Sequence, residues 1–284
     1  EISVAEAGLA AFVAPGVENA GVINAKMGKV VLASGNTVTL DLYGDNLVEI
    51  AVDGKLENAL VKNSGTINAE GGSVALSAQA AKSAVDNVIN MDGVVNVSSV
   101  SVRGGKIILG GGNKGTVKVS GKLKADGKNG GGSVKVTGEN IDVSVAGLLS
   151  ADAIENGDGG TIYVYGRDYA IFSGRVSARG GALGGNGGFV EISAANDVGY
   201  DGSVTTLAPL GLAGSFLIDP LYAFIHSGSL NSSNPTNRFI SADSLALDLK
   251  NNANVTVQAT NKIDVGSTTS GGGVGNGTVD VSTA

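Results

Sequence analysis

The sequence predicts an all-β protein whose chain is wound into a right-handed parallel β-helix. Three observations lead to this fold class. The composition is rich in glycine and aliphatic residues, short runs alternate apolar with polar residues, and these runs recur about every 27 residues.

Glycine is the outlier of the composition. The chain has 284 residues, of which 46 are glycine and only 4 are proline, and it has six phenylalanines, six tyrosines and no tryptophan. An average protein contains about 7% glycine, so glycine is here about twice as frequent as usual. Because the glycines lie between apolar runs, collagen and disordered linkers are excluded. Many tight turns between aliphatic strands are expected instead.

The net charge and the cysteine content limit which partners and which cellular compartment can be expected. The net charge is −7 and no basic cluster occurs, so we expect no nucleic-acid partner. The lack of cysteine fits both a cytosolic chain and one exported unfolded through an oxidising compartment, and export is favoured. No stretch of about 18 apolar residues occurs, so no membrane insertion is expected. The start at Glu1 without a signal segment indicates a mature or excised portion.

A repeat that starts with glycine runs through the chain. Its copies begin at intervals of 28, 28, 26, 27 and 28 residues, at Gly65, Gly93, Gly121, Gly147, Gly174 and Gly202. Each copy holds two alternating runs joined by a glycine-bearing turn, and a third apolar run follows, such as residues 141–143 or 169–172. Three short strands and three turns make one coil, which buries its inward face only when stacked on neighbours about 4.8 Å away. The alternative, a β-sandwich, is disfavoured because these strands are short and the period is long.

Equivalent residues of successive copies are expected to stack on one another. Four small residues occupy one such position, where a narrow interior would suit them: Ala25, Ala69, Ala125 and Ala178. Asn24 and Asn68 also match each other. They either form hydrogen bonds along the axis or are ordinary turn residues, and the sequence leaves both interpretations open.

The predicted β-helix covers residues 1–219 in about seven coils. An early copy at residues 21–34 lies 44 residues before Gly65, and the extra length contains an alternating stretch, residues 37–54, predicted as an inserted hairpin or strand pair. Residues 220–284 break the register, with a polar loop at 231–237 and one or two helical turns at 240–249. This part is predicted to begin a further β-helical segment.

Four blocks of the sequence resemble the haemagglutination-activity region of filamentous-haemagglutinin-like adhesins, which leave the cell by two-partner secretion. The blocks are residues 7–45, 173–193, 214–220 and 240–259, and together with the repeats they cover nearly the whole chain. The resemblance implies a virulence-associated protein of a Gram-negative bacterium, secreted or held at the outer cell surface. It also implies a β-helical fibre that binds glycans or receptors of host or neighbouring cells, with lateral or end-to-end contacts between fibres.

The resemblance further implies a partner for export, an outer-membrane β-barrel transporter. The family's transporter-recognition region carries Asn-Pro-Asn motifs, and this sequence has none. We therefore expect the transporter to be engaged through a region outside these residues.

The sequence offers little catalytic chemistry, so neither a catalytic residue nor an enzyme activity is expected. His226 is the single histidine and there is no cysteine, which leaves the common transition-metal sites out of reach. Parallel β-helices do include polysaccharide lyases and hydrolases, and a polysaccharide-acting enzyme is the alternative function. Such an enzyme needs carboxylates converging on one sheet face, whereas the acids here are scattered.

One acidic turn is the candidate metal site. Asp152, Glu155 and Asp158 lie close together in it, and calcium is the ion that such oxygens would take. The alternating spacing of calcium loops is missing, which favours a solvated acidic loop. No other cofactor is expected.

The one concentration of aromatic residues is the candidate ligand-binding site. It comprises Tyr163, Tyr165, Tyr169 and Phe172. Facing outward, these rings would form a platform on which sugar rings stack; facing inward, they would fill a wide part of the core. The alternation with Ile162 and Val164 favours the core or intercoil interpretation. The expected function is a rigid adhesin or filament segment. A third interpretation, an ice-binding or matrix protein, is disfavoured because it needs a flat Thr ladder and the threonines do not line up between copies.

Overall fold

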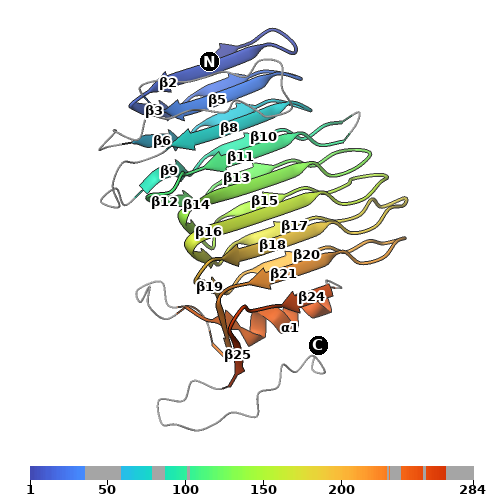
Figure 1. The fold of residues 1–284 in the computed structure, drawn as a ribbon. Helices are drawn as coiled ribbons and strands as arrows, with labels where there is room; N and C mark the ends of the chain where they lie inside the picture. The colour runs from blue at the N-terminus through green and yellow to red at the C-terminus, as the bar shows by residue number, and fades with distance from the viewer. Residues whose placement is uncertain are drawn as a thin grey trace.

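Parallel β-strands dominate the protein (Figure 1). The computed structural model describes residues 1–35, 59–78, 87–100, 103–228, 230, 238–251 and 254–266. Within this part the strands form an eight-stranded and a 17-stranded sheet, and every pairing between named strands is parallel. The predicted all-β class built from parallel strands is confirmed.

The strands form three stacks, because successive parts of the chain return to the same position one layer further along (Figure 1). Stack A consists of β1 (Ile2–Ser3), β4 (Val22–Asn24), β7 (Thr66–Asn68), β10 (Val94–Asn96), β13 (Lys122–Lys124), β15 (Leu148–Ser150), β17 (Arg175–Ser177) and β20 (Ser203–Thr205). Stack B consists of β2 (Leu9–Ala14), β5 (Lys29–Ser34), β8 (Ser73–Ala78), β11 (Lys106–Gly110), the first halves of β14 (Ser133–Val143) and β16 (Thr161–Phe172), β18 (Phe189–Ala194), β21 (Ser215–Asp219) and β24 (Asn254–Val257). Stack C consists of β3 (Gly16–Asn19), β6 (Leu60–Asn63), β9 (Asn87–Met91), β12 (Thr116–Val119), the second halves of β14 and β16, β19 (Asp197–Tyr200), β22 (Tyr222–His226) and β25 (Lys262–Val265).

The register of stack A follows the glycine repeat. Val95 pairs with Leu123, Leu149 with Val176, and Val176 with Val204, all from successive copies. Across the longer interval Ile23 pairs with Ile67, so the copy at residues 21–34 belongs to the same stack. The stretch 37–54, predicted as an insertion, lies outside the described residues.

The starting glycines are explained by the closeness of the coils. A Cβ atom on Gly93 would overlap the carbonyl oxygen of Gly65, and one on Gly121 would overlap that of Gly93. Any side chain at this corner would push two coils apart, which explains why glycine recurs at this position of the repeat.

Equivalent residues of successive copies stack on one another as expected, alanines inside the stack and the Asn24–Asn68 pair on its outer face. The four alanines of the predicted small-residue position are fully buried: Ala25, Ala69, Ala125 and Ala178. The Asn68 Nδ2 atom donates a hydrogen bond to Asn24 Oδ1 at 3.0 Å, and Asn19 Nδ2 donates to Asn63 Oδ1 at 2.7 Å. The stacked-asparagine interpretation is therefore correct for the Asn24–Asn68 pair.

The strands after Asp219 continue the same stacks. β24 pairs with β21 and β25 pairs with β22, and β23 (Ile240–Ser241) lies between β19 and β22. Eight described strands of stack A precede residue 219, where about seven coils were predicted, and the first of them, β1, belongs to a layer formed by β1–β3. The polar loop 231–237 lies outside the described residues, and a domain boundary at 219 stays a prediction.

The described part of stack A ends at β20, and α1 (Ala242–Lys250) packs against this strand (Figure 1). The predicted helical turns are confirmed: Ser241 is the N-cap, and its side chain accepts a hydrogen bond from the Ser244 amide at 3.3 Å. The Asp248 side chain reaches back to β20 and accepts a hydrogen bond from the Val204 amide at 2.7 Å. The Asp248 side chain thus accepts the hydrogen bond of a β20 backbone amide that would otherwise pair with a further strand of stack A.

Candidate ligand-binding surface

Two tyrosines of β16 project from the outer face of stack B. Ile162 and Val164 alternate with them and are fully buried, so Tyr163 and Tyr165 point away from the core. Their rings are 6.1 Å apart between centroids and 16° from parallel, and both side chains are half-buried. We call these two residues the tyrosine pair. They place two nearly parallel rings next to each other along the outer face of one strand.

Charged residues flank the tyrosine pair on the neighbouring strands. Lys135 on β14 and Glu191 on β18 both pair in register with Tyr163. The Lys135 Nζ atom lies 5.6 Å from the centre of the Tyr163 ring, a cation–π contact. Burial and the negative charge of Glu191 raise the pKa of the Tyr163 hydroxyl, so this group stays neutral and able to donate a hydrogen bond.

A hollow of about 210 Å³ opens beside Tyr165. It lies where β18 and β21 turn from stack B into stack C, and we call it the corner hollow. Its walls are Tyr165, Glu191, Ser193, Ala194, Ala195, Asp219, Pro220, Leu221 and Thr260. Sites for drug-sized ligands start at about 300 Å³, so the corner hollow fits a single small group next to the aromatic surface.

The two other residues of the predicted platform do not join the tyrosine pair. Tyr169 lies on stack C, where the Arg238 guanidinium covers its ring at 3.8 Å and also forms an ion pair with Asp197 at 3.1 Å. Phe172 is fully buried in the core, 6.3 Å from the ring of Tyr200. The four-residue platform is therefore wrong as a set, because Phe172 lies an odd number of positions after the tyrosines and so faces inward.

The acidic turn does not bring its three carboxylates together. Asp152 accepts hydrogen bonds from the Ser177 hydroxyl and the Arg179 amide, Asp158 accepts one from the Asn186 amide, and Glu155 lies 3.4 Å from Lys128. Burial raises the pKa of Asp152, which these hydrogen bonds partly oppose. Among the described residues no three acidic or histidine side chains gather as metal ligands. The turn is a set of contacts between coils, and the calcium prediction finds no support in its geometry.

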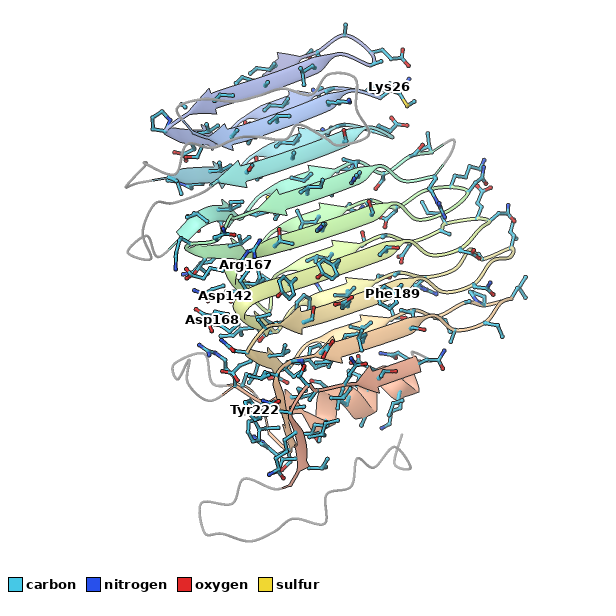
Figure 2. All side chains as sticks on the ribbon, viewed as in Figure 1. Lys26, Asp142, Arg167, Asp168, Phe189 and Tyr222 are labelled. Carbon is cyan, nitrogen blue, oxygen red and sulfur yellow. The ribbon has the colours of Figure 1, made fainter. Side chains whose placement is uncertain are left out.

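A second aromatic surface lies on β22 and was missed by the sequence analysis. Tyr222 and Phe224 are 40% and 42% exposed, with ring centroids 6.5 Å apart, and Figure 2 labels Tyr222. His226 follows on the same side, and its ring lies 3.7 Å from that of Phe239. We call Tyr222, Phe224 and His226 the aromatic strip. The signal was the alternation of ring-bearing residues in the run 222–226, which lies in the part predicted as a separate segment.

A longer groove of about 370 Å³ runs along the turns between stacks A and B. Glycine backbone forms most of its walls, with Arg103 and Lys106 at its edge. The amides of Gly104, Gly105 and Gly132 donate hydrogen bonds to the neighbouring backbone. This groove therefore has few groups left to recognise a ligand.

Comparisons with known proteins give a partial match. No family model matches the chain. The heme/hemopexin-binding protein of Haemophilus influenzae is 36% identical over 81 residues, which are 28% of this chain and 8% of that protein. The chain thus covers a small part of this relative's length. In the described part of the chain, no helix is long and apolar enough to cross a membrane.

Proposed function

We propose that this chain is a segment of a secreted adhesin of the filamentous-haemagglutinin kind, and that it attaches cells through surface glycans. In this proposal the chain is a right-handed β-helix with coils of about 27 residues and an insertion at residues 37–54. The observation that carries the proposal is the tyrosine pair, two nearly parallel rings held on the outside of a regular stack.

The tyrosine pair suits the apolar face of a sugar chain. A ring stacked on an aromatic surface buries its C–H groups, while neighbouring hydroxyls and carboxylates bind the sugar hydroxyls. The stack below provides rigidity, because the backbone of β16 is hydrogen-bonded to β14 on one side and to β18 on the other. The rings are thus held in place before a ligand arrives, which reduces the entropy lost on binding.

The remaining parts of the proposal concern the whole protein. We place it outside a Gram-negative cell, exported through an outer-membrane β-barrel transporter that recognises a region other than these residues. The stacks fit a fibre, since each layer repeats the previous one and leaves its outer faces accessible. Lateral or end-to-end contacts between fibres belong to the same proposal.

A glycan array and a cell-binding assay with this chain test the proposal. We expect binding by the wild-type chain and its loss in the double variant Tyr163→Ala/Tyr165→Ala. Tyr222→Ala is the matched control, because it removes an exposed ring from stack C. A folded wild-type chain that binds neither glycans nor cells overturns the proposal, and release of sugar fragments from a polysaccharide would favour the enzyme alternative instead.

The aromatic strip supports a second candidate function, heme binding. The relative's name includes heme, and His226 would supply a nitrogen ligand to a heme beside the exposed rings of Tyr222 and Phe224. Titration with heme should then give a shifted visible absorption band that His226→Ala abolishes and Tyr165→Ala leaves unchanged. An unshifted band with the wild-type chain excludes this candidate.

A further inference from the structure

We propose that the corner hollow binds the protonated amine of an amino sugar, while the tyrosine pair stacks the sugar rings. This inference rests on the proposed glycan binding and adds its chemical selectivity. It starts from two carboxylates in the wall of the hollow, Glu191 on β18 and Asp219 at the end of β21.

The negative charge of these two carboxylates is not balanced within the described part of the chain. No ion pair joins Glu191 or Asp219 to a basic side chain there. Their side-chain partners are neutral: the Ser193 hydroxyl donates to Glu191 Oε1 at 2.8 Å, and the Gln258 amide donates to Asp219 Oδ2 at 3.4 Å. Lys135 lies two strands before Glu191, with the Tyr163 strand between them. The carboxylates of Glu191 and Asp219 therefore keep negative charge that can attract a cation entering the hollow.

The aromatic wall adds to the preference for a cation. Tyr165 belongs to the hollow, and the face of a tyrosine ring attracts an ammonium group within about 6 Å. Ser193 is nearly fully buried, so its bond to Glu191 holds the carboxylate in place. A sulfated or carboxylated sugar would be repelled here, and an N-acetylated one would bring no charge to offset.

The tyrosine pair favours a glycan over a lysine side chain as the carrier of the amine. Two rings 6.1 Å apart and nearly parallel offer a surface longer than one ammonium group can use. Successive sugar rings cover such a surface, whereas a flexible lysine stem would lose more conformational entropy for less aromatic contact.

Calorimetric titration with oligosaccharides of equal length tests this inference. The probes are a glucosamine oligomer with free amines, its fully N-acetylated counterpart, and an oligolysine peptide. We expect the free-amine oligomer to bind about 10-fold more tightly than the N-acetylated one, the size expected of a hydrogen bond between charged groups. Equal affinity for the two oligomers, or equally tight binding of oligolysine, overturns the inference.

Charge-neutral variants locate the selectivity. Glu191→Gln and Asp219→Asn should each reduce the preference for the amine to about 3-fold or less while leaving the affinity for the N-acetylated oligomer unchanged. Glu155→Gln is the matched control, because it removes one negative charge from a distant loop. Retention of the full preference in both hollow variants also overturns the inference.

The two proposals fail in different ways. If the wild-type chain binds no glycan and no cells, glycan attachment itself is wrong. If it binds glycans through Tyr163 and Tyr165 without regard to the amine, attachment stands and the cation selectivity of the corner hollow is wrong.

Discussion

The protein places a carboxylate beside a tyrosine in two regions, with opposite consequences. At the end of stack A, Asp248 is fully buried and accepts hydrogen bonds from the Tyr200 hydroxyl and the Val204 amide. On the outer face of stack B, Glu191 lies half-buried beside the tyrosine pair, in the wall of a hollow. The inner carboxylate has its hydrogen bonds completed by the fold, whereas the outer one retains capacity for a ligand.

The difference comes from the direction of the side chains rather than from their chemistry. Tyr200 points inward and packs between two rings, stacked on Phe172 at 6.3 Å between centroids and tilted against Phe216 at 5.2 Å. Tyr163 occupies the opposite face of its strand and keeps part of its ring in solvent. The parity of its position on a strand thus decides whether a tyrosine packs in the core, as Tyr200 of β19 does, or lies on the outer face, as Tyr163 of β16 does.

The largest expected effect on stability is that of Asp248→Ala. The change leaves the Tyr200 hydroxyl and the Val204 amide unpaired in the core, at a cost of about 3 kcal/mol in the free energy of unfolding. Urea unfolding at pH 5 measures it. Asp219→Ala on the outer face is the control and should cost less than about 1 kcal/mol, so similar losses in the two variants would contradict the comparison.

The inner carboxylate should also make stability depend on pH. Burial raises the pKa of Asp248 from its ordinary 3.8 to about 7. Between these values the folded chain holds a proton that the unfolded chain lacks, so the free energy of unfolding rises as the pH falls from 7 towards 4. We expect the chain to be more stable at pH 5 than at pH 8 by on the order of 2 kcal/mol.

The variant Asp248→Asn isolates this group from the other titrating side chains. An asparagine cannot take up the proton. The free energy of unfolding of this variant should therefore differ between pH 5 and pH 8 by on the order of 2 kcal/mol less than that of the wild-type chain. An unchanged pH dependence in Asp248→Asn would show that the carboxyl is already ionised in the folded protein.

A smaller loss is expected at the start of the same helix. Ser241→Ala removes the side chain that accepts the Ser244 amide, and such N-cap losses cost about 1 kcal/mol. Urea unfolding under the same conditions checks it. A threonine at this position should retain most of the stability, and a loss equal to that of alanine would argue against capping as the cause.

The smallest effect is expected at the outer carboxylate. Glu191→Gln keeps the shape of the side chain and its acceptor for the Ser193 hydroxyl, so the free energy of unfolding should change by less than about 0.5 kcal/mol. A loss above 1 kcal/mol would mean that Glu191 serves the fold as Asp248 does.

Much of the fold followed from the repeat. The glycine intervals identified the residues that pair across stack A, because coils that touch at Gly65, Gly93 and Gly121 leave no room for a side chain. The layer β1–β3 and the insertion of β23 between β19 and β22 were missed. Both depend on contacts between distant segments that no local pattern encodes.

The candidate site was predicted less well. Alternation showed that Tyr163 and Tyr165 share a face opposite Ile162 and Val164, but it did not decide which face is the outer one, and the core or intercoil interpretation was favoured. The odd spacing between Phe172 and the tyrosines already indicated that Phe172 faces the opposite side of the strand. Asp219 and Glu191 are 28 positions apart and line one hollow only because adjacent coils stack, with Asp219 in register with Ser193. The corner hollow could therefore be found only once the register of β18 and β21 was known.

The most direct test of the account is the dissociation constant of the best-binding glycan for three proteins measured together. The wild-type chain and Tyr222→Ala should bind equally, whereas Tyr163→Ala/Tyr165→Ala should bind at least about 10-fold more weakly while unfolding at a similar urea concentration. Equal affinity of the folded double variant would contradict the account and remove the tyrosine pair from the binding surface.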